Sequence, residues 1–523
     1  MKLKNILYIA LLFILTLSLG ACKKEKFNIN SNPDDVTDNS VTPAVILPGA
    51  LQNTSRLVAV DWAFLQMWLG YWARSGSYQS LTEIETYRFG NDFQLGIWND
   101  LYSNANNYDI MVRKAKASGA GFYEAIGRIM KAHNFGILVD VYNNVPYFQA
   151  FQGTVAATPK YDSGLEIYKD LFKQLDTAVT LLKTPTAIEA AKNADIKTSD
   201  LVYGGDANAW IRFSNTLRLR LIVHLLNGTT STTVASSINV SAEAAKVTSE
   251  GFINTGQSAH INPGFSATKP NPYYRSYVQD ESGTQRGDIN RANDYAIRYY
   301  TANGDPRIDQ FYVAPGSGHK GNLFGRPSDA TGLYTGDKLS TVRGPGLIPK
   351  DASSRAWILT SVESLFLQAE ARERGVLTSG VSAQNLLTNA VRESFVWLGL
   401  TTADADDYFV FNTGYPDVDY TAPPKVPGEP GGGIITILHQ KWFALNSIAT
   451  YEVWTDYRRT DIVYGKAIGF SSGPPISVDP NNTATKIPYR LLYPQNEYNY
   501  NAANVGAQGT INVFTNKIFW DLN

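Results

Sequence analysis

Apolar residues recur every three or four positions in several segments of the chain, which is the spacing of one face of an α-helix. The pattern is clearest in residues 163–183, where the apolar positions are Leu165, Tyr168, Phe172, Leu175, Val179 and Leu182. Ser163 and Glu166 stand three residues apart at its start, as in a capping box. This segment is therefore predicted to be an amphipathic helix.

Five further segments carry the same periodicity. They are residues 121–142, 206–226, 361–375, 382–395 and 434–459. In the first of them, Ala125, Ala132 and Gly136 share a face, and small residues at that spacing allow a neighbouring helix to approach closely. Helices of this kind need partners to cover their apolar faces, so the sequence predicts a mainly α protein with a tetratricopeptide-like scaffold of helix pairs.

Between the predicted helices lie long stretches rich in Gly, Pro, Asn and Ser, at residues 227–355, 400–433 and 465–515. Loops longer than about 15 residues are usually functional or disordered. These stretches also carry aromatic residues, which favours function, so they are predicted to be irregular insertions in the scaffold. The Pro- and Gly-rich residues 421–433 could end a domain, or they could form a loop inside one, because a helical pattern follows directly.

The N-terminus has the pattern of a secretory signal peptide at residues 1–21: Lys2 and Lys4, an apolar run from residue 6 to 19, then small residues. The run is shorter than the roughly 20 apolar residues of a membrane span, so we expect a mature protein without a transmembrane helix.

Cys22 is the only cysteine among 523 residues, and the preceding Leu19-Gly20-Ala21 resembles a bacterial lipobox. We predict that Cys22 carries the lipid anchor, that residues 22–45 form a leash and strap, and that residues 22–523 form one domain. The alternative is an ordinary secreted protein with a stray thiol.

Composition narrows the choice of partner. The formal net charge is −1, and removal of a signal peptide with its two lysines would make it −3, so nothing favours nucleic acid as a partner. Charged residues make up 18% of the chain and aromatic residues 12%. Because Tyr and Trp are amphipathic, part of this aromatic excess could contact a partly polar ligand.

Motifs of catalysis and cofactor binding are present only in incomplete form. "GSGHKG" at residues 316–321 precedes no helical pattern, and "GFSSG" at residues 469–473 precedes two prolines. The five histidines have no zinc-ligand spacing, and the acidic clusters at residues 404–407 and 417–419 lack the glycine of a calcium loop. We therefore predict no cofactor, no metal site and no catalytic residue, although 47 acidic residues leave a glycosidase carboxylate pair open.

Four stretches, in order along the chain, resemble the SusD/RagB family of outer-membrane nutrient-binding lipoproteins, in its SusD-like branch. They are residues 27–51, 205–225, 361–375 and 486–505. The third resembles the family's Glu-x-x-Leu…Ala-Glu-Ala helix through Glu363, Ala369, Glu370 and Ala371. The resemblance implies a tetratricopeptide-like core with long insertions, no enzymatic activity, and anchoring on the cell-surface side of the outer membrane.

The same resemblance implies a function: capture of oligosaccharides and their delivery to a TonB-dependent outer-membrane transporter. Three alternatives stay open. They are a surface glycoside hydrolase, capture of a non-glycan nutrient such as a peptide, and a structural or adhesive surface protein.

Sugar binding needs aromatic platforms with polar partners, and two clusters offer them. The first is Tyr71, Trp72, Arg74 and Tyr78, where a helical interpretation places Tyr71 and Trp72 on one face and ends the helix after Arg74. The second is Tyr273, Tyr274, Arg275 and Tyr277, where Pro270 and Pro272 argue against a helix. The alternative for both clusters is that the aromatic rings pack against the scaffold.

Overall fold

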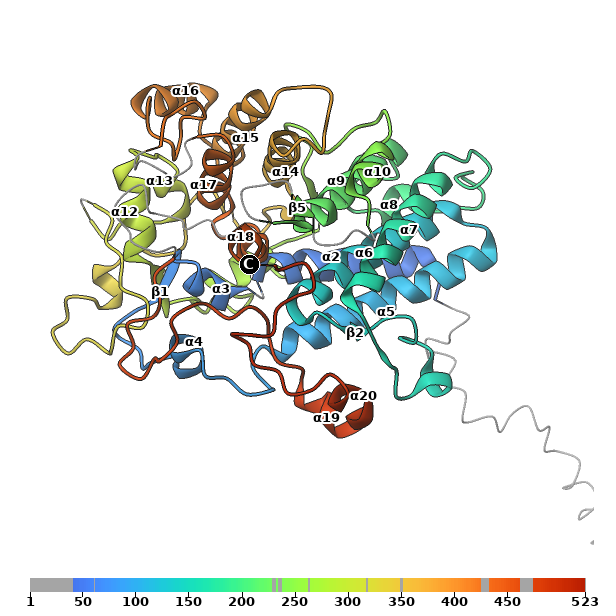
Figure 1. The fold of residues 1–523 in the computed structure, drawn as a ribbon, viewed down its shortest axis with the longest axis horizontal. Coiled ribbons are helices and arrows are strands. Elements are labelled where there is room, and N and C mark those ends of the chain that lie inside the picture. The colour runs from blue at the N-terminus through green and yellow to red at the C-terminus, as the bar shows by residue number, and fades with distance from the viewer. Residues whose placement is uncertain are drawn as a thin grey trace, which may run out of the picture. The chain divides into compact units, whose positions relative to one another are not determined.

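The architecture is that of a computed structural model, which describes residues 41–522 apart from 61, 228–231, 234–237, 262–263, 317, 349–350, 425–431 and 461–473. Helices make up about 49% of it and the strands are few and short, so the prediction of a mainly α fold is confirmed (Figure 1). The predicted signal peptide, Cys22 and most of the predicted strap lie outside the described residues.

One group of helices packs in the order of the sequence. It comprises α5 (Leu95–Ser118), α6 (Gly121–Tyr142), α7 (Gly164–Leu182) and α9 (Ala207–His224). Each contacts the next, and Figure 1 shows α5, α6 and α7 side by side. A Cβ atom on Gly127 of α6 would lie 2.7 Å from Val112 Cγ2 of α5, so the helices approach as closely as they do only because this residue is glycine.

A second group comprises α14 (Ser361–Glu373), α15 (Ala383–Trp397), α16 (Thr402–Phe411), α17 (Ile434–Leu445) and α18 (Thr450–Thr460). α14 packs against α15 and α17, and it also contacts α9 of the first group. The two groups therefore share one core, and the described residues from Pro43 onward belong to one compact unit.

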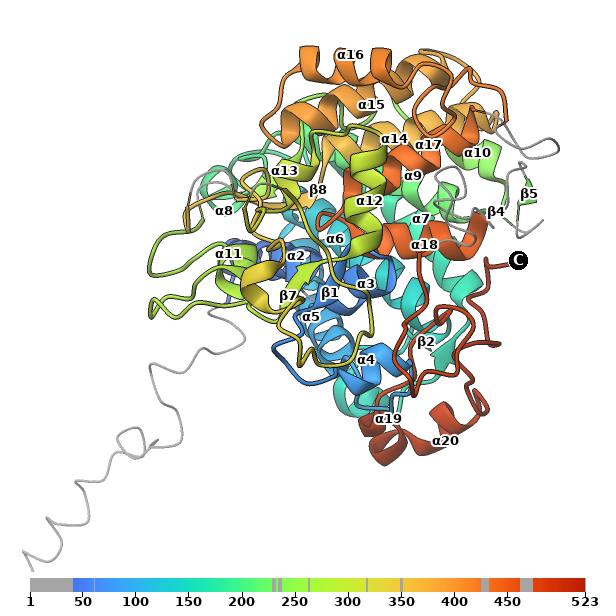
Figure 2. The same cartoon turned by 90° about the vertical axis from the view of Figure 1, so that its left-hand side faces the viewer.

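The other elements pack beside these groups (Figure 2). The remaining helices are α2 (Pro43–Val60), α3 (Ala63–Trp68), α4 (Thr82–Thr86), α8 (Ile196–Ser199), α10 (Val240–Ala245), α11 (Pro272–Tyr277), α12 (Asp294–Ala302), α13 (Ile308–Phe311), α19 (Gln495–Tyr500) and α20 (Ala502–Gly506). The described strands form antiparallel pairs: β1 (Trp72–Arg74) with β7 (Asn290–Ala292), β2 (Val145–Pro146) with β3 (Tyr161–Asp162), β4 (Leu226–Asn227) with β5 (Thr232–Thr233), and β6 (Ala259–Ile261) with β8 (Ala356–Leu359).

Side-chain caps fix where the predicted helices begin. The oxygens of Ser163, Asp206, Thr360 and Ser382 accept hydrogen bonds from backbone amides at the starts of α7, α9, α14 and α15. These four helices and α6 confirm the predictions for their segments to within a few residues.

The prediction of one continuous helix over residues 434–459 was wrong. The segment is two helices, α17 and α18, because the chain turns between them and Ser447 adopts a φ of +60°. Two long helices, α2 and α5, were not predicted. In α5 the buried residues Ile97, Leu101, Tyr108 and Met111 do follow a helical spacing. Asn104 lies on the same face and donates a hydrogen bond to Thr54 Oγ1 of α2 at 2.9 Å.

Charged side chains from three helices meet in the core. Arg220 of α9 donates to Glu363 Oε1 of α14, with Nε at 2.7 Å, and its Nε lies 3.3 Å from Glu452 Oε1 of α18. All three side chains are buried. Burial of a charge is costly unless an opposite charge accompanies it, so these helices are bound to one another through matched charges.

His224 lies one turn after Arg220 and extends this cluster. Its Nδ1 is 3.0 Å from Asp140 Oδ2 of α6 and its Nε2 is 2.9 Å from Glu452 Oε2. Burial alone would lower the pKa of His224, but Glu452 and Asp140 raise it to about 9. The imidazole is therefore charged at neutral pH and bridges α6 to α18.

The Glu-x-x-Leu…Ala-Glu-Ala motif on α14 also contributes buried, paired charges. Glu370 accepts from Nη1 and Nη2 of Arg459 at 2.7 and 2.6 Å, and from Arg374 Nε at 2.8 Å. We name this set of buried charges, Asp140, Arg220, His224, Glu363, Glu370, Glu452 and Arg459, the ionic core. Glu363 thus links the two helix groups through Arg220, whereas Glu370 joins α14 to α18 within the second group, and both side chains are buried.

Candidate functional site

Most of the first predicted cluster is buried. The helix predicted there ends at Trp68, Gly70 adopts a φ of +80°, and strand β1 begins at Trp72. The Tyr71 ring stacks on Trp442 with centroids 4.6 Å apart, and the Trp72 ring meets the edge of Tyr277 at 4.9 Å. Tyr71 and Trp72 are core residues, so the prediction that they bind ligand is corrected.

Half of the second cluster is buried as well. Residues 272–277 form helix α11, with Asn271 as its cap, so the argument that the prolines prevent a helix was wrong. Pro272 stands in the first turn, where its missing N–H has no partner to lose. Tyr273 and Tyr277 point into the core, and each hydroxyl donates to a backbone carbonyl. They are not available to a ligand.

Tyr274 and Arg275 remain at the surface of α11. The Tyr274 side chain is half-buried and its hydroxyl lies 3.4 Å from Gln279 Oε1. The Arg275 side chain is 59% exposed and binds both oxygens of Glu281 at 2.8 Å. Arg275 also lines a cleft between α11 and α2.

Arg74 is buried, so the prediction that it contacts ligand is also corrected. Its Nε donates to Glu85 Oε1 at 2.8 Å, its Nη2 to the carbonyl oxygen of Arg326 at 2.6 Å, and its Nη1 to the carbonyl oxygen of Tyr78. Arg74 therefore ties together two surface loops, residues 75–81 and 326–336, from underneath.

Backbone hydrogen bonds join the same two loops. The Gly76 amide donates to the Tyr334 carbonyl at 2.9 Å, and the Asp329 amide donates to the Gly76 carbonyl at 3.2 Å. A Cβ atom on Gly76 would lie 2.7 Å from Tyr334 O, so this contact requires glycine. The loops are held as one surface although some 250 residues separate them in the sequence.

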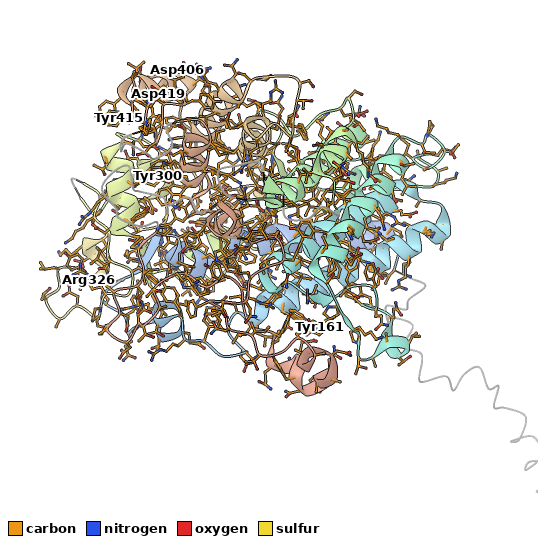
Figure 3. The ribbon with its side chains drawn as sticks, viewed as in Figure 1. Tyr161, Tyr300, Arg326, Asp406, Tyr415 and Asp419 are labelled. Atoms are coloured by element: carbon orange, nitrogen blue, oxygen red, sulfur yellow. The ribbon has the colours of Figure 1, made fainter. Side chains whose placement is uncertain are left out.

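This surface presents aromatic and cationic groups. The Tyr78 side chain is 40% exposed, and among the described residues it has no ring partner and no side-chain hydrogen bond. The Arg326 guanidinium lies 3.7 Å from the ring centroid of Tyr334, and Lys320 Nζ lies 4.6 Å from it. Figure 3 shows Arg326 at the edge of the unit, on the side of β1 and α12. We call Tyr78, Lys320, Arg326 and Tyr334 the Tyr78 surface.

The Tyr78 surface has the chemistry that sugar binding needs. An exposed phenol ring offers a face to the C–H groups of a sugar, and the guanidinium and ammonium groups can donate to its hydroxyls. Of its four residues only Tyr78 was predicted from the sequence. Residues 326–336 contain three glycines or prolines around Tyr334, and this turn-rich setting of an aromatic residue is the signal that was overlooked.

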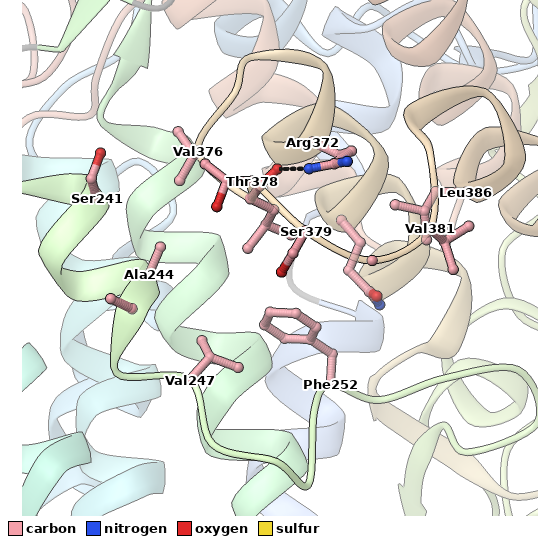
Figure 4. Close-up of a pocket in the computed structure, with 14 residues that line it drawn as sticks. Ser241, Ala244, Val247, Phe252, Arg372, Val376, Thr378, Ser379, Val381 and Leu386 are labelled. Carbon is pink, nitrogen blue, oxygen red and sulfur yellow. Dashed lines mark hydrogen bonds between the residues drawn. The ribbon is translucent and has the colours of Figure 1, made fainter.

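The cleft of about 520 Å³ between α10 and the loop that joins α14 to α15 has a different character (Figure 4). Its walls are mostly aliphatic, and Phe252 is the one aromatic residue in its lining. At its rim the Arg372 guanidinium donates to the carbonyl oxygen of Leu377 at 2.6 Å. The lining also carries polar side chains, among them Ser241, Gln368 and Thr378, but it offers a single ring for stacking, so we favour the Tyr78 surface with its two rings as the glycan site.

Within the described residues, the metal and dinucleotide motifs considered in the sequence add no competing site. In the part of the chain that the structure describes, no three His, Cys, Asp or Glu side chains gather as metal ligands would. No helix follows Gly316–Gly321 directly, and residues 469–473 lie outside the described residues. The described helices include none with both the length and the apolarity of a membrane crossing.

A scaffold of packed helix pairs that presents aromatic and cationic groups on its connecting loops defines a binding protein of the tetratricopeptide-like class. A family model matches residues 36–494, and its description reads "Starch-binding associating with outer membrane". The chain therefore belongs to the SusD-like family.

Solved structures support the same assignment of the fold. A chitin-binding SusD homologue from Flavobacterium johnsoniae is 22% identical, with a TM-score of 0.67 over 91% of this chain and 99% of that one. A SusD-like protein from Bacteroides thetaiotaomicron is 19% identical, with a TM-score of 0.69 over 91% and 99%. A further chitin-binding protein is 22% identical, with a TM-score of 0.69 over 92% and 100%. No curated protein sequence matches this chain.

Proposed function

We propose that this protein captures oligosaccharides at the cell surface and delivers them to a TonB-dependent outer-membrane transporter, and that the Tyr78 surface is where the glycan binds. The observation that carries the proposal is that Arg74 joins residues 75–81, which carry the exposed Tyr78 ring, to residues 326–336, where two cations contact the Tyr334 ring. Preformed loops lose little conformational entropy when a ligand binds.

Family membership supports the glycan part of this proposal, because the family is described as starch-binding and outer-membrane associated. Two of the similar structures are named as chitin-binding. The proposal also includes export by a signal peptide at residues 1–21, acylation at Cys22 and exposure on the outer face of the membrane.

A binding assay tests the site. Titration calorimetry of the purified chain with starch and chitin oligosaccharides is compared with the same titration of Tyr78→Ala. Loss of a stacking ring costs roughly 1–2 kcal/mol, so we expect affinity to fall about tenfold. Tyr500→Ala is the control, because Tyr500 is 77% exposed on α19 and lies outside the surface. Equal affinity of both variants would remove Tyr78 from the site.

Two further experiments address the rest of the proposal. Incubation with the bound oligosaccharide should leave it intact, and released shorter products would favour a glycoside hydrolase. Purification of the tagged protein from its own membranes should also recover a TonB-dependent transporter. Its absence from a preparation that still binds glycan would contradict the delivery step.

A further inference from the structure

A second cleft, of about 500 Å³, lies between α2, α11 and the loop that precedes α11. Ligand sites in proteins usually enclose roughly 300–1,000 Å³. The cleft shares no lining residue with the Tyr78 surface. It is built from parts of the chain that are about 220 residues apart, because Gln52 of α2 hydrogen-bonds to the loop at Lys269.

The cleft combines an apolar wall with free polar groups. Phe265, Pro270 and Pro272 supply apolar surface. Asn53 and Ser276 also line it, and in the described part of the chain their side chains have no protein hydrogen-bond partner. A sugar ring has an apolar face and a polar rim, so it matches both kinds of group.

The charges in the cleft are unequal. Three cations line it, Arg56, Lys269 and Arg275, but only one carboxylate, Glu281. Arg275 pairs with Glu281, and Arg56 pairs with Asp100, which stands outside the lining, at 2.7 Å. Among the described residues Lys269 forms no ion pair, and its ammonium group is oriented by the neutral amide oxygen of Gln52. An anion in the cleft would therefore meet a positive charge that no carboxylate neutralises.

We propose that this cleft is a second ligand site, and that it takes an oligosaccharide carrying a carboxylate group. The carboxylate faces Lys269, with Arg56 and Arg275 on either side, and the sugar ring rests on the apolar wall. This inference rests on the proposed function of glycan capture, and it adds a preference for acidic over neutral sugars.

The test uses a matched pair of probes, tri-galacturonic acid and its methyl ester, which share a skeleton and differ in charge. Titration calorimetry of the purified chain should give at least about tenfold tighter binding of the acid. The preference should shrink when the salt concentration is raised from about 0.05 to about 0.5 M, because the charges are partly exposed. Equal affinity for acid and ester would overturn the proposal.

Two variants that should change the affinity for the acid in opposite directions make the test more specific. Lys269→Gln should weaken binding of the acid about tenfold and leave the ester unaffected. Glu281→Gln should strengthen binding of the acid, because it releases Arg275 and removes the competing carboxylate. Lys192→Gln is the control, since Lys192 is an exposed lysine paired with Glu189 outside the cleft. A Lys269→Gln variant that binds the acid as the wild type does would also overturn the proposal.

Inorganic sulfate distinguishes a sugar site from a general anion site. If sulfate binds as tightly as tri-galacturonic acid and Lys269→Gln removes both, the cleft holds small anions and the sugar assignment is wrong. A failure of the cleft proposal can be told apart from a failure of the proposed function. Tyr78→Ala should lower the affinity for neutral oligosaccharides and leave the preference for the acid unchanged. Neutral binding that depends on Tyr78, without any acid preference, would refute the cleft alone.

Discussion

Replacement of Arg74 by Met should lower both the stability of the protein and its affinity for the ligand. The Met side chain has similar length but no charge, so Glu85 would keep only the Ser80 hydroxyl, at 2.5 Å, as a partner. The carbonyl oxygens of Tyr78 and Arg326 would also lose their donor. The loss of Glu85's ion-pair partner and the loss of the donor that joins the two loops both follow from removal of one guanidinium group.

The expected loss of unfolding free energy follows from the burial of the ion pair. Arg74 and Glu85 expose 1% and 0% of their side chains, so water does not screen the charge that is left. Removal of one partner of a buried ion pair costs about 3–5 kcal/mol. Because Ser80 remains as a hydrogen-bond donor, we expect the lower end, about 3 kcal/mol of unfolding free energy.

Urea unfolding followed by tryptophan fluorescence measures this loss, and calorimetry with the bound oligosaccharide measures affinity. The double variant Arg74→Met/Glu85→Gln should recover about 2 kcal/mol, since no buried carboxylate is left unpaired. Its affinity should stay low, because the two loops still lack the donor that joins them.

Two results would refute this reasoning. An unfolding free energy of Arg74→Met within about 1 kcal/mol of the wild type would show that the pair contributes little. Full recovery of glycan affinity in the double variant would show that Arg74 does not position the loops.

Three other changes probe the structure. Tyr273→Ala should lower the unfolding free energy by about 3–5 kcal/mol because its ring is buried. Tyr274→Ala on the same helix should lower it by less than about 1 kcal/mol. Equal losses in urea unfolding would contradict the orientation of α11. The folded-state pKa of His224, about 9, lies above the ordinary histidine value of 6.5. The unfolding free energy should therefore fall by about 3 kcal/mol as pH rises from 6.5 through 9, and His224→Gln should abolish this slope. Gly76→Ala should push residues 75–81 away from Tyr334. It should therefore lower glycan affinity several-fold with little loss of stability. Unchanged affinity would argue against the Tyr78 surface as the binding site.

The sequence predicted the scaffold well where periodicity and caps agree, as in α7 and α9. It missed α5, although Leu101, Ala105 and Tyr108 follow a helical spacing there, and it did not identify Asn104 as a polar residue of the same buried face. Prolines were interpreted as helix breakers at residue 272, although one in the first turn is compatible with a helix.

The candidate site was harder to predict for a different reason. Aromatic residues pack well in a core and also serve as platforms for sugars. Residues 71–78 contain both buried aromatic residues and an exposed one, and the sequence alone does not distinguish them. The Tyr71 and Trp72 rings are buried against Trp442 and Tyr277, which lie more than 200 residues away in the sequence, and no local pattern contains that information. The importance of Arg326 and Tyr334 likewise depends on a loop contact that only the folded chain reveals.

The ionic core has a consequence for biogenesis. In ordinary helical repeat arrays, stability comes from neighbours along the chain, so partial arrays can fold alone. Here Arg220 and His224 on α9 find their counter-charges at residues 363 and 452. An emerging polypeptide that has reached only α9 would hold Arg220 and His224 with Asp140 of α6 as the one carboxylate of the ionic core, so the N-terminal helices should not reach their final packing until α18 has been synthesised. For the export proposed above such a delay would be an advantage, because a chain that completes its packing only when its last third is present can still cross a membrane unfolded.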